Sequence, residues 1–188
     1  MARASGLSSI ETRTRLGRLS DEGLVKLDPG PFGGWALTDD GLAAAQEKVQ
    51  VELDSAGSRD QVRKCFDSFL ELNPALLEIC TDWQMRMVGR QPTLNDHTDA
   101  DYDASVISRL MRIDDSAQRL CDELSGSLSR FGLYGVRLTD ALDRVLAGES
   151  AYLADDLESY HTVWFQLHED LLATLGLSRG GGAWEASR

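Results

Sequence analysis

From residue 59 onward, apolar residues recur with the period of an α-helix and nowhere alternate with the period of a strand. Val62, Cys65, Phe66, Phe69 and Leu72, for example, fall on one stripe of a helix. We expect helices at 59–72, 74–88, 101–130, 134–147 and 152–175. Asn73 would cap the second of them, because Pro74 suits a first-turn position. The sequence therefore predicts a mainly α protein whose residues 59–177 form an all-α domain.

The first fifty residues have shorter elements. A helix is expected at 9–22, with Ser8 or Ser9 as its N-cap, with Ile10, Leu16 and Leu19 on its apolar side, and with Gly23 at its end. Strands at 24–27 and 34–38 would flank a Pro/Gly-rich tip, and Asp39 or Asp40 would cap a helix at 41–53. We therefore place a separate domain at residues 1–53. Residues 178–188, with three consecutive glycines, are expected to be a flexible tail.

Charge separates the same two regions. The chain has 19 Lys and Arg residues against 31 Asp and Glu residues, a net charge of −12, which excludes coating of nucleic acid by bulk charge. It also disfavours an anionic membrane surface, and no apolar stretch is long enough to span a bilayer. Residues 1–27, in contrast, carry more basic than acidic side chains. Such asymmetry indicates two units with different partners.

Three cysteines, Cys65, Cys80 and Cys121, are widely spaced and form no C-x-x-C pair. An odd number without a spacing pattern favours buried free thiols in a reducing compartment. A cytoplasmic protein is therefore expected.

The N-terminal region resembles the winged helix-turn-helix domain of transcriptional regulators of the MarR, PadR and GntR kinds. Residues 19–25 follow the pattern L-x-x-x-G-L-V, which ends a recognition helix, and residues 35–41 follow W-x-L-T-x-x-G, which ends the wing. Gly6 would permit the turn before the recognition helix. The resemblance implies a homodimer that binds double-stranded DNA with two recognition helices.

Helical geometry divides the recognition helix into two faces. Thr12, Leu16 and Leu19 share one arc and would pack inward, which leaves the opposite face for the major groove. The expected DNA-binding residues are Ser8, Ser9, Glu11, Arg13, Thr14, Gly17, Arg18 and Lys26.

The segment departs from the winged-helix pattern in one respect, because the chain begins at what would be its second helix. Leu16, Leu19, Leu24 and Trp35 would then lack a packing partner. One hypothesis is that Met1 is a false start and a first helix lies upstream. The other is that helices of the body, or of a dimer mate, cover the gap.

The helical body contains a second candidate site, a polar-lined pocket for a small-molecule effector. All three histidines lie in two segments rich in aromatic and polar residues. The expected ligand-binding residues are Trp83, Asn95, Asp96, His97, Tyr102, Asp103, His161, Trp164 and His168.

Calcium and transition-metal sites are weaker interpretations of these segments. Asp99, Asp101 and Asp103 begin like an EF-hand, but Ala104 and Leu110 stand where the loop needs glycine and glutamate, so we expect the acids to cap a helix. His161 and His168 would lie about 10 Å apart along a helix, too far to chelate one ion unaided.

No cofactor motif and no catalytic pattern is present, so we expect a regulator that is not an enzyme. Two alternatives stay open. The winged helix could bind a protein instead of DNA, as the acidic body suggests. The chain could also be a small helical enzyme or metal protein that uses Asp96, His97, His161 and His168.

Overall fold

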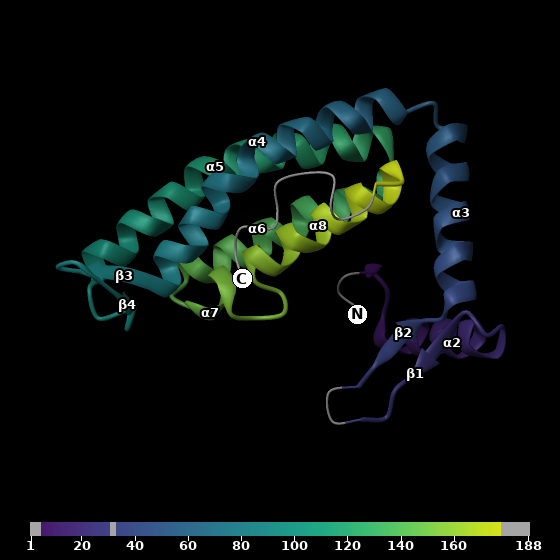
Figure 1. The fold of residues 1–188 in the computed structure, drawn as a ribbon, viewed down its shortest axis with the longest axis horizontal. Helices are drawn as coiled ribbons and strands as arrows, with labels where there is room; N and C mark the ends of the chain where they lie inside the picture. The colour runs from purple at the N-terminus through teal and green to yellow at the C-terminus, as the bar shows by residue number, and fades with distance from the viewer. Residues whose placement is uncertain (1–4, 31–32, 178–188) are drawn as a thin grey trace. The chain divides into compact units, whose positions relative to one another are not determined.

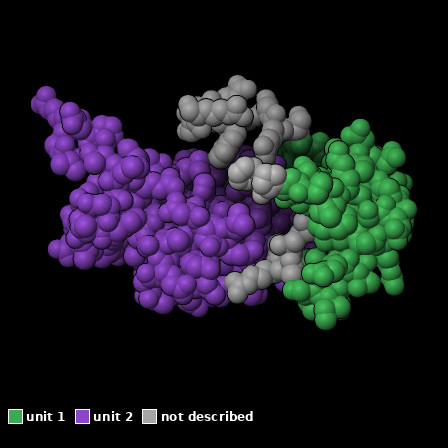
Figure 2. Space-filling view, turned by 90° about the horizontal axis from the view of Figure 1, so that it is seen from below, with its two compact units in different colours: residues 1–57, 172–188 green, residues 58–171 purple. Residues whose placement is uncertain are grey.

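The computed structural model describes residues 5–30 and 33–177. These residues form seven α-helices, one short 3-10 helix and two small antiparallel sheets of two strands each (Figure 1). The expected mainly helical class is therefore confirmed. The chain divides into two compact units, residues 1–57 with 172–188, and residues 58–171, coloured separately in Figure 2.

Helix α2 (Ser9–Asp21) belongs to unit 1. Residues next to it in the sequence cap both of its ends. Ser8 is the N-cap, as predicted: its hydroxyl accepts from the backbone of Glu11, whose carboxylate accepts from the backbone of Ser8. At the other end Gly23 adopts a φ of 72°, as expected. Its N–H bonds to Ser20 and that of Leu24 to Leu19, which satisfies two carbonyls of the last turn.

A hairpin and a longer helix follow α2. Strand β1 (Val25–Leu27) pairs with β2 (Trp35–Leu37), and α3 spans Asp39–Ser55. The prediction that Asp39 or Asp40 caps α3 was wrong. Thr38 is the cap, because its hydroxyl accepts from the backbone of Gly41 while it donates to the carbonyl of Gly23. One threonine therefore joins the end of α2 to the start of α3.

Unit 1 buries few side chains among its described residues. No residue of α2 is buried, and in the hairpin only Val25 is. Leu16, Leu19 and Trp35 are half-buried. Ile10, which we placed on the apolar side of the helix, is 80% exposed. That prediction was wrong because, at 100° per residue, Ile10 lies on the opposite side of α2 from the half-buried Leu16 and Leu19.

Unit 2 begins with a helix that is longer than the sequence indicated. Helix α4 runs without a break from Arg59 to Gln84, whereas we expected two helices separated at Asn73. Pro74 lies inside α4, where it removes one backbone donor. The apolar stripe continues on both sides of it through the buried Phe69 and Leu76, so packing outweighs the lost hydrogen bond. Asn73 is not a cap, and its side chain accepts from Trp164.

The expectation that residues from 59 onward contain no strand was also wrong. Strands β3 (Met85–Val88) and β4 (Gln91–Leu94) form an antiparallel hairpin where we expected the end of a helix and a loop. Gly89, with a φ of 65°, supplies the left-handed residue that a two-residue hairpin turn needs. Four-residue strands are too short to show a clear alternation in the sequence.

The rest of unit 2 is helical. Helix α5 (Ala100–Ser127) is capped by Asp99, as expected, and a 3-10 turn (Ser129–Phe131) leads into α6 (Gly132–Leu146). The helix expected at 152–175 is divided into α7 (Ala151–Ala154) and α8 (Tyr160–Leu175). Ser159 causes the division, because its hydroxyl accepts from the backbone of Thr162 and so starts a new helix.

Helices α4, α5, α6 and α8 pack around the main core (Figure 1). Trp164, Tyr160, Phe69 and Phe131 are its largest fully buried side chains. Cys65, Cys80 and Cys121 are buried and unpaired, as expected. Within the described ranges, no helix combines the length and the apolar character that crossing a membrane requires.

Candidate nucleic-acid interface and polar cluster

Helix α2 presents a polar face to solvent. Arg13, Thr14 and Arg18 are exposed, whereas Thr12 and Leu16, on the other side, are half-buried. The residues that we expected to pack inward are therefore less exposed than these three residues, which we expected to contact DNA.

Three basic residues of this region have no acidic partner among the described residues. In the part of the chain that the structure describes, Arg13, Arg18 and Lys26 form no ion pair. A side chain added at Gly17, the small residue of the same face, would have no atom within 4 Å. The face is thus open and positively charged.

Some of the expected DNA-binding residues form hydrogen bonds within α2 and its N-terminal cap. Ser8 and Glu11 are joined in the capping box, and hydrogen bonds from Ser8 lower the pKa of the Glu11 carboxyl below its usual range. The hydroxyl of Thr14 donates to the carbonyl of Ile10. Ser9 is exposed in the first turn. These contacts orient the end of α2 and leave the arginines as its main free donors.

Lys26 lies in the β1–β2 hairpin. Its partner in register is Ala36, so the two share one face of the hairpin. The opposite face carries Val25, Leu27, Trp35 and Leu37. The tip beyond Lys26 includes residues 31 and 32, which lie outside the described residues.

Four of the expected ligand-binding residues meet where the β3–β4 hairpin joins α5. The side-chain amide of Asn95 donates to the carbonyl of Trp83 at 3.0 Å and to the carboxylate of Asp103 at 2.8 Å. The ring of His97 lies 4.5 Å from that of Trp83, and its Nδ1 is 3.0 Å from Asp103. We call Trp83, Asn95, His97 and Asp103 the polar cluster.

The hydrogen bonds of the polar cluster fix the tautomer of His97. An amide nitrogen has two hydrogens, and Asn95 uses both on Trp83 and Asp103. Its 3.2 Å approach to Nδ1 of His97 is therefore no hydrogen bond. Nδ1 carries a hydrogen that it donates to Asp103, which leaves Nε2 as the acceptor edge of a ring whose side chain is 31% exposed. Such an oriented imidazole can accept a hydrogen bond from a ligand.

The polar cluster also contains an unusual backbone conformation, at His97. Its φ is 57°, a left-handed conformation that side chains other than glycine rarely adopt. A hydrogen bond from its N–H to the side chain of Asn95, at 3.3 Å, helps to hold it there. The Nε1 of Trp83 is buried without a hydrogen-bond partner among the described residues. Both features carry a cost in free energy at the same place.

Asp96 and Tyr102 border the polar cluster. Asp96 accepts from Thr98 and pairs with Arg86, which also pairs with Asp99. Tyr102 donates to the backbone carbonyl of Asp82 near the end of α4. These contacts join the hairpin to the N-cap residue of α5, and α5 to the end of α4. Arg86 escaped our sequence analysis because only the hairpin register brings it to the two acids.

The other three expected ligand residues lie elsewhere on α8. Trp164 donates to Asn73 and stacks on Phe69 at 4.4 Å, and His168 stacks on Phe69 at 5.1 Å. Asn73 is ten residues before Trp83 on α4, roughly 15 Å along the helix. The nine residues therefore do not converge on one site, and Trp164 and His168 are part of the helix packing.

His161 is half-buried in the first turn of α8. Burial lowers the pKa of its imidazole below the usual value, and the carboxylate of Asp155 opposes that shift. Across the described ranges, no three His, Cys, Asp or Glu side chains are grouped so that they could hold a metal ion.

Comparison with known proteins adds no relative. The chain matches no protein-family model, no curated protein and no solved structure. Any function must therefore be argued from these residues and their geometry.

Proposed function

We propose that this protein is a cytoplasmic DNA-binding transcriptional regulator. Unit 1 would act as a winged helix, with α2 in the major groove and Lys26 of the hairpin near a neighbouring phosphate. Unit 2 would join two copies, so that two α2 helices read one palindromic site about one turn of DNA apart.

One observation carries the proposal. Helix α2 offers Arg13 and Arg18 on an exposed face without ion-pair partners among the described residues, in a chain whose net charge is −12. An acidic protein that keeps two arginines unpaired on the exposed part of a capped helix has a local surface for an anion. Arginine in the major groove can donate to guanine through two hydrogen bonds.

The experiment is fluorescence anisotropy with a duplex from upstream of the protein's own gene and with a scrambled duplex of equal length. Tighter binding to the native duplex, weakening as salt rises, is the expected result. Arg13→Glu with Arg18→Glu should weaken that binding roughly 100-fold or more, because both groove contacts are lost.

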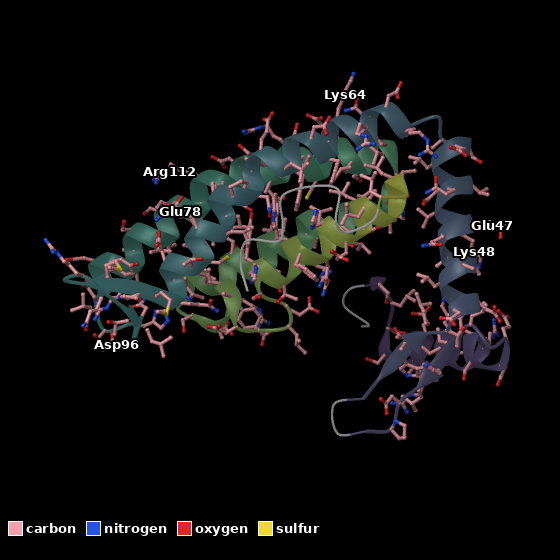
Figure 3. The ribbon with its side chains drawn as sticks, in the orientation of Figure 1. Glu47, Lys48, Lys64, Glu78, Asp96 and Arg112 are labelled. Carbon is pink, nitrogen blue, oxygen red and sulfur yellow. The ribbon has the colours of Figure 1, made fainter. Side chains whose placement is uncertain are left out.

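A matched control separates local contacts from overall charge. Lys64→Glu with Arg112→Glu changes the net charge equally, but on exposed positions of α4 and α5 in unit 2 (Figure 3). That variant should bind DNA nearly as well as the original chain. Equal losses in both variants, or no preference for the native duplex, would contradict the proposal.

The polar cluster is the proposed place for a small effector, because it combines an oriented histidine with a left-handed backbone next to a hairpin. An effector that bound His97 would favour one conformation of the β3–β4 hairpin and would thereby change the arrangement of the two copies in the dimer. Trp83 lies 4.5 Å from that ring, so binding should change its fluorescence.

A second candidate function is protein binding by unit 1. The apolar face of the β1–β2 hairpin favours it, because Leu27 and Leu37 are about half exposed. Replacing both by threonine should abolish a protein complex under this alternative. The double arginine variant should then leave that complex intact.

A further inference from the structure

A groove with a volume of about 380 Å³ lies between α5 and α6, within unit 2. Its lining includes Gln118, Asp122 and Ser125 from α5, and Gly135, Val136 and Thr139 from α6. On each helix these residues are three or four positions apart, so they share one side of that helix. Pockets for small molecules have volumes of roughly 300–1,000 Å³. We call this feature the α5–α6 groove.

The floor of the α5–α6 groove is formed where two glycines of α6 approach α5. A Cβ atom at Gly132 would lie 2.8 Å from Oγ of Ser125, and one at Gly135 would lie 3.2 Å from Cβ of Cys121. Cys121 is 2% exposed, and burial, with a smaller effect of the Asp122 carboxylate, raises the pKa of its thiol to about 12. The thiol is therefore neutral near pH 7, and the floor carries no charge.

The side chain of Gln118 is held with its oxygen toward the groove. Its Nε2 donates to Oδ1 of Asp114 at 3.0 Å, and the same oxygen accepts from the buried Tyr160 hydroxyl at 2.9 Å. Because a carboxylate only accepts hydrogen bonds, the amide nitrogen of Gln118 must face Asp114. Oε1 then lies beside Gly135, 3.2 Å from the position of a Cβ there. The groove thus contains an acceptor that a buried hydrogen-bond network orients.

Three further polar side chains of the groove are available to a ligand. Asp122 is exposed and forms no ion pair within the described ranges. The hydroxyls of Ser125 and Thr139 have no hydrogen-bond partner there either. Among the described lining residues there is no lysine, arginine or histidine. The groove therefore offers one negative charge and several acceptors, with no positive charge to balance them.

We propose that the α5–α6 groove binds a small primary amine with an apolar body. An ammonium group carries one positive charge and three N–H donors, which match the Asp122 carboxylate, Oε1 of Gln118 and the Thr139 hydroxyl. Gln118 and Asp122 are four residues apart on α5 and so lie next to each other. An anion would be repelled by Asp122, and a neutral ligand would leave that carboxylate without a partner.

The rest of the groove suits the apolar body of such an amine. Val136 is 67% exposed and lines the groove beside the glycine floor. From Gln118 to Ser125 the groove follows seven residues of α5, roughly 10 Å along the helix. An arylalkyl amine such as tyramine has about this length, and its phenol would meet the hydroxyl of Ser125 at the far end.

The α5–α6 groove is separate from the polar cluster. Asp103, the member of that cluster on α5, is fifteen residues before Gln118, roughly 22 Å along the helix. The inference therefore does not rest on the proposed function or on the effector site proposed with it.

Calorimetric titration of the full chain tests the inference, with tyramine as the probe. Tyrosol, in which a hydroxyl replaces the ammonium group, is its neutral analogue. Tyramine should bind once per chain and more weakly as salt rises. Tyrosol should bind at least about tenfold more weakly, because it cannot form the charged hydrogen bonds. Equal affinity for the two compounds would overturn the assignment of an amine.

Variants locate the charge that the amine meets. Asp122→Asn should weaken tyramine binding about tenfold or more, because it removes the charge but keeps the shape of the side chain. The matched control, Asp115→Asn, removes another exposed carboxylate of α5 that is not among the described lining residues, and should leave the affinity nearly unchanged. Equal losses in both variants would mean attraction by overall charge and would overturn the site.

Amide chemical shifts, measured by NMR on the full chain, identify the binding site independently. Tyramine should shift the amides of residues 118–125 and 132–139 and leave those of residues 95–103 unchanged. Shifts confined to residues 95–103, or no saturable binding, would overturn the inference. None of these measurements contains a duplex, so their outcome is distinguishable from the success or failure of the DNA-binding proposal.

Discussion

At the scale of single residues, His161 makes the stability of unit 2 depend on pH. Burial lowers the pKa of its imidazole in the folded protein, so the folded state holds a proton less readily than the unfolded chain. Above the ordinary value near 6.5 both states are neutral and stability is complete. As pH falls below that value the unfolded chain binds protons first, and stability decreases until the folded imidazole is protonated too.

We therefore predict that His161→Gln flattens this dependence. Urea unfolding at about pH 8 and about pH 5 should show a smaller loss of unfolding free energy in the variant than in the original chain. His168→Gln, on the same helix, is the control for the loss of any imidazole. An unchanged difference between the two pH values in His161→Gln would contradict the prediction.

At the scale of elements, Gly41 decides how α3 follows the hairpin. A Cβ atom at this position would lie 1.8 Å from the backbone carbonyl oxygen of Leu24, and backbone cannot move aside as a side chain can. The carbonyl is itself fixed, because it accepts from the N–H of Thr38. This steric clash explains why the last position of the W-x-L-T-x-x-G pattern is a glycine in this structure.

Gly41→Ala should consequently destabilise unit 1 by about 3 kcal/mol or more. Gly17→Ala is the matched control: its Cβ meets nothing within 4 Å, and alanine in a helix interior should stabilise α2 by up to about 1 kcal/mol. Hydrogen exchange of the amides of residues 9–55 measures both effects. Equal protection in Gly41→Ala and the original chain would refute the steric argument.

At the scale of the whole molecule, buried side chains are unevenly shared between the two units. Most of the described core, including Phe69, Tyr160 and Trp164, lies in unit 2, whereas α2 of unit 1 has no buried residue. Burial of apolar surface is the main favourable term in folding. Unit 1 should therefore open at a lower free energy than unit 2.

Native-state hydrogen exchange checks this expectation, with faster exchange predicted in α2, β1 and β2 than in α4, α5 and α8. Uniform protection across both units would mean that unit 1 is stabilised by something other than its own described core.

Local sequence signals determined the elements whose ends are closed by their own side chains. Ser8, Gly23 and Asp99 act within a few residues of themselves, so their roles as caps were predictable. The helical period of residues 59–177 likewise determined the class of the body, because it depends only on which face is apolar.

Only the tertiary structure decided what depends on contacts between distant segments. Packing carries α4 through Pro74, and the bond from Trp164 gives Asn73 a partner that no local pattern reveals. The β3–β4 register brings Arg86 to its acids, and the same fold separates Trp164 and His168 from the polar cluster. Periodicity states which residues turn inward on one element, but the partner that they meet is fixed by how elements far apart in the chain pack together.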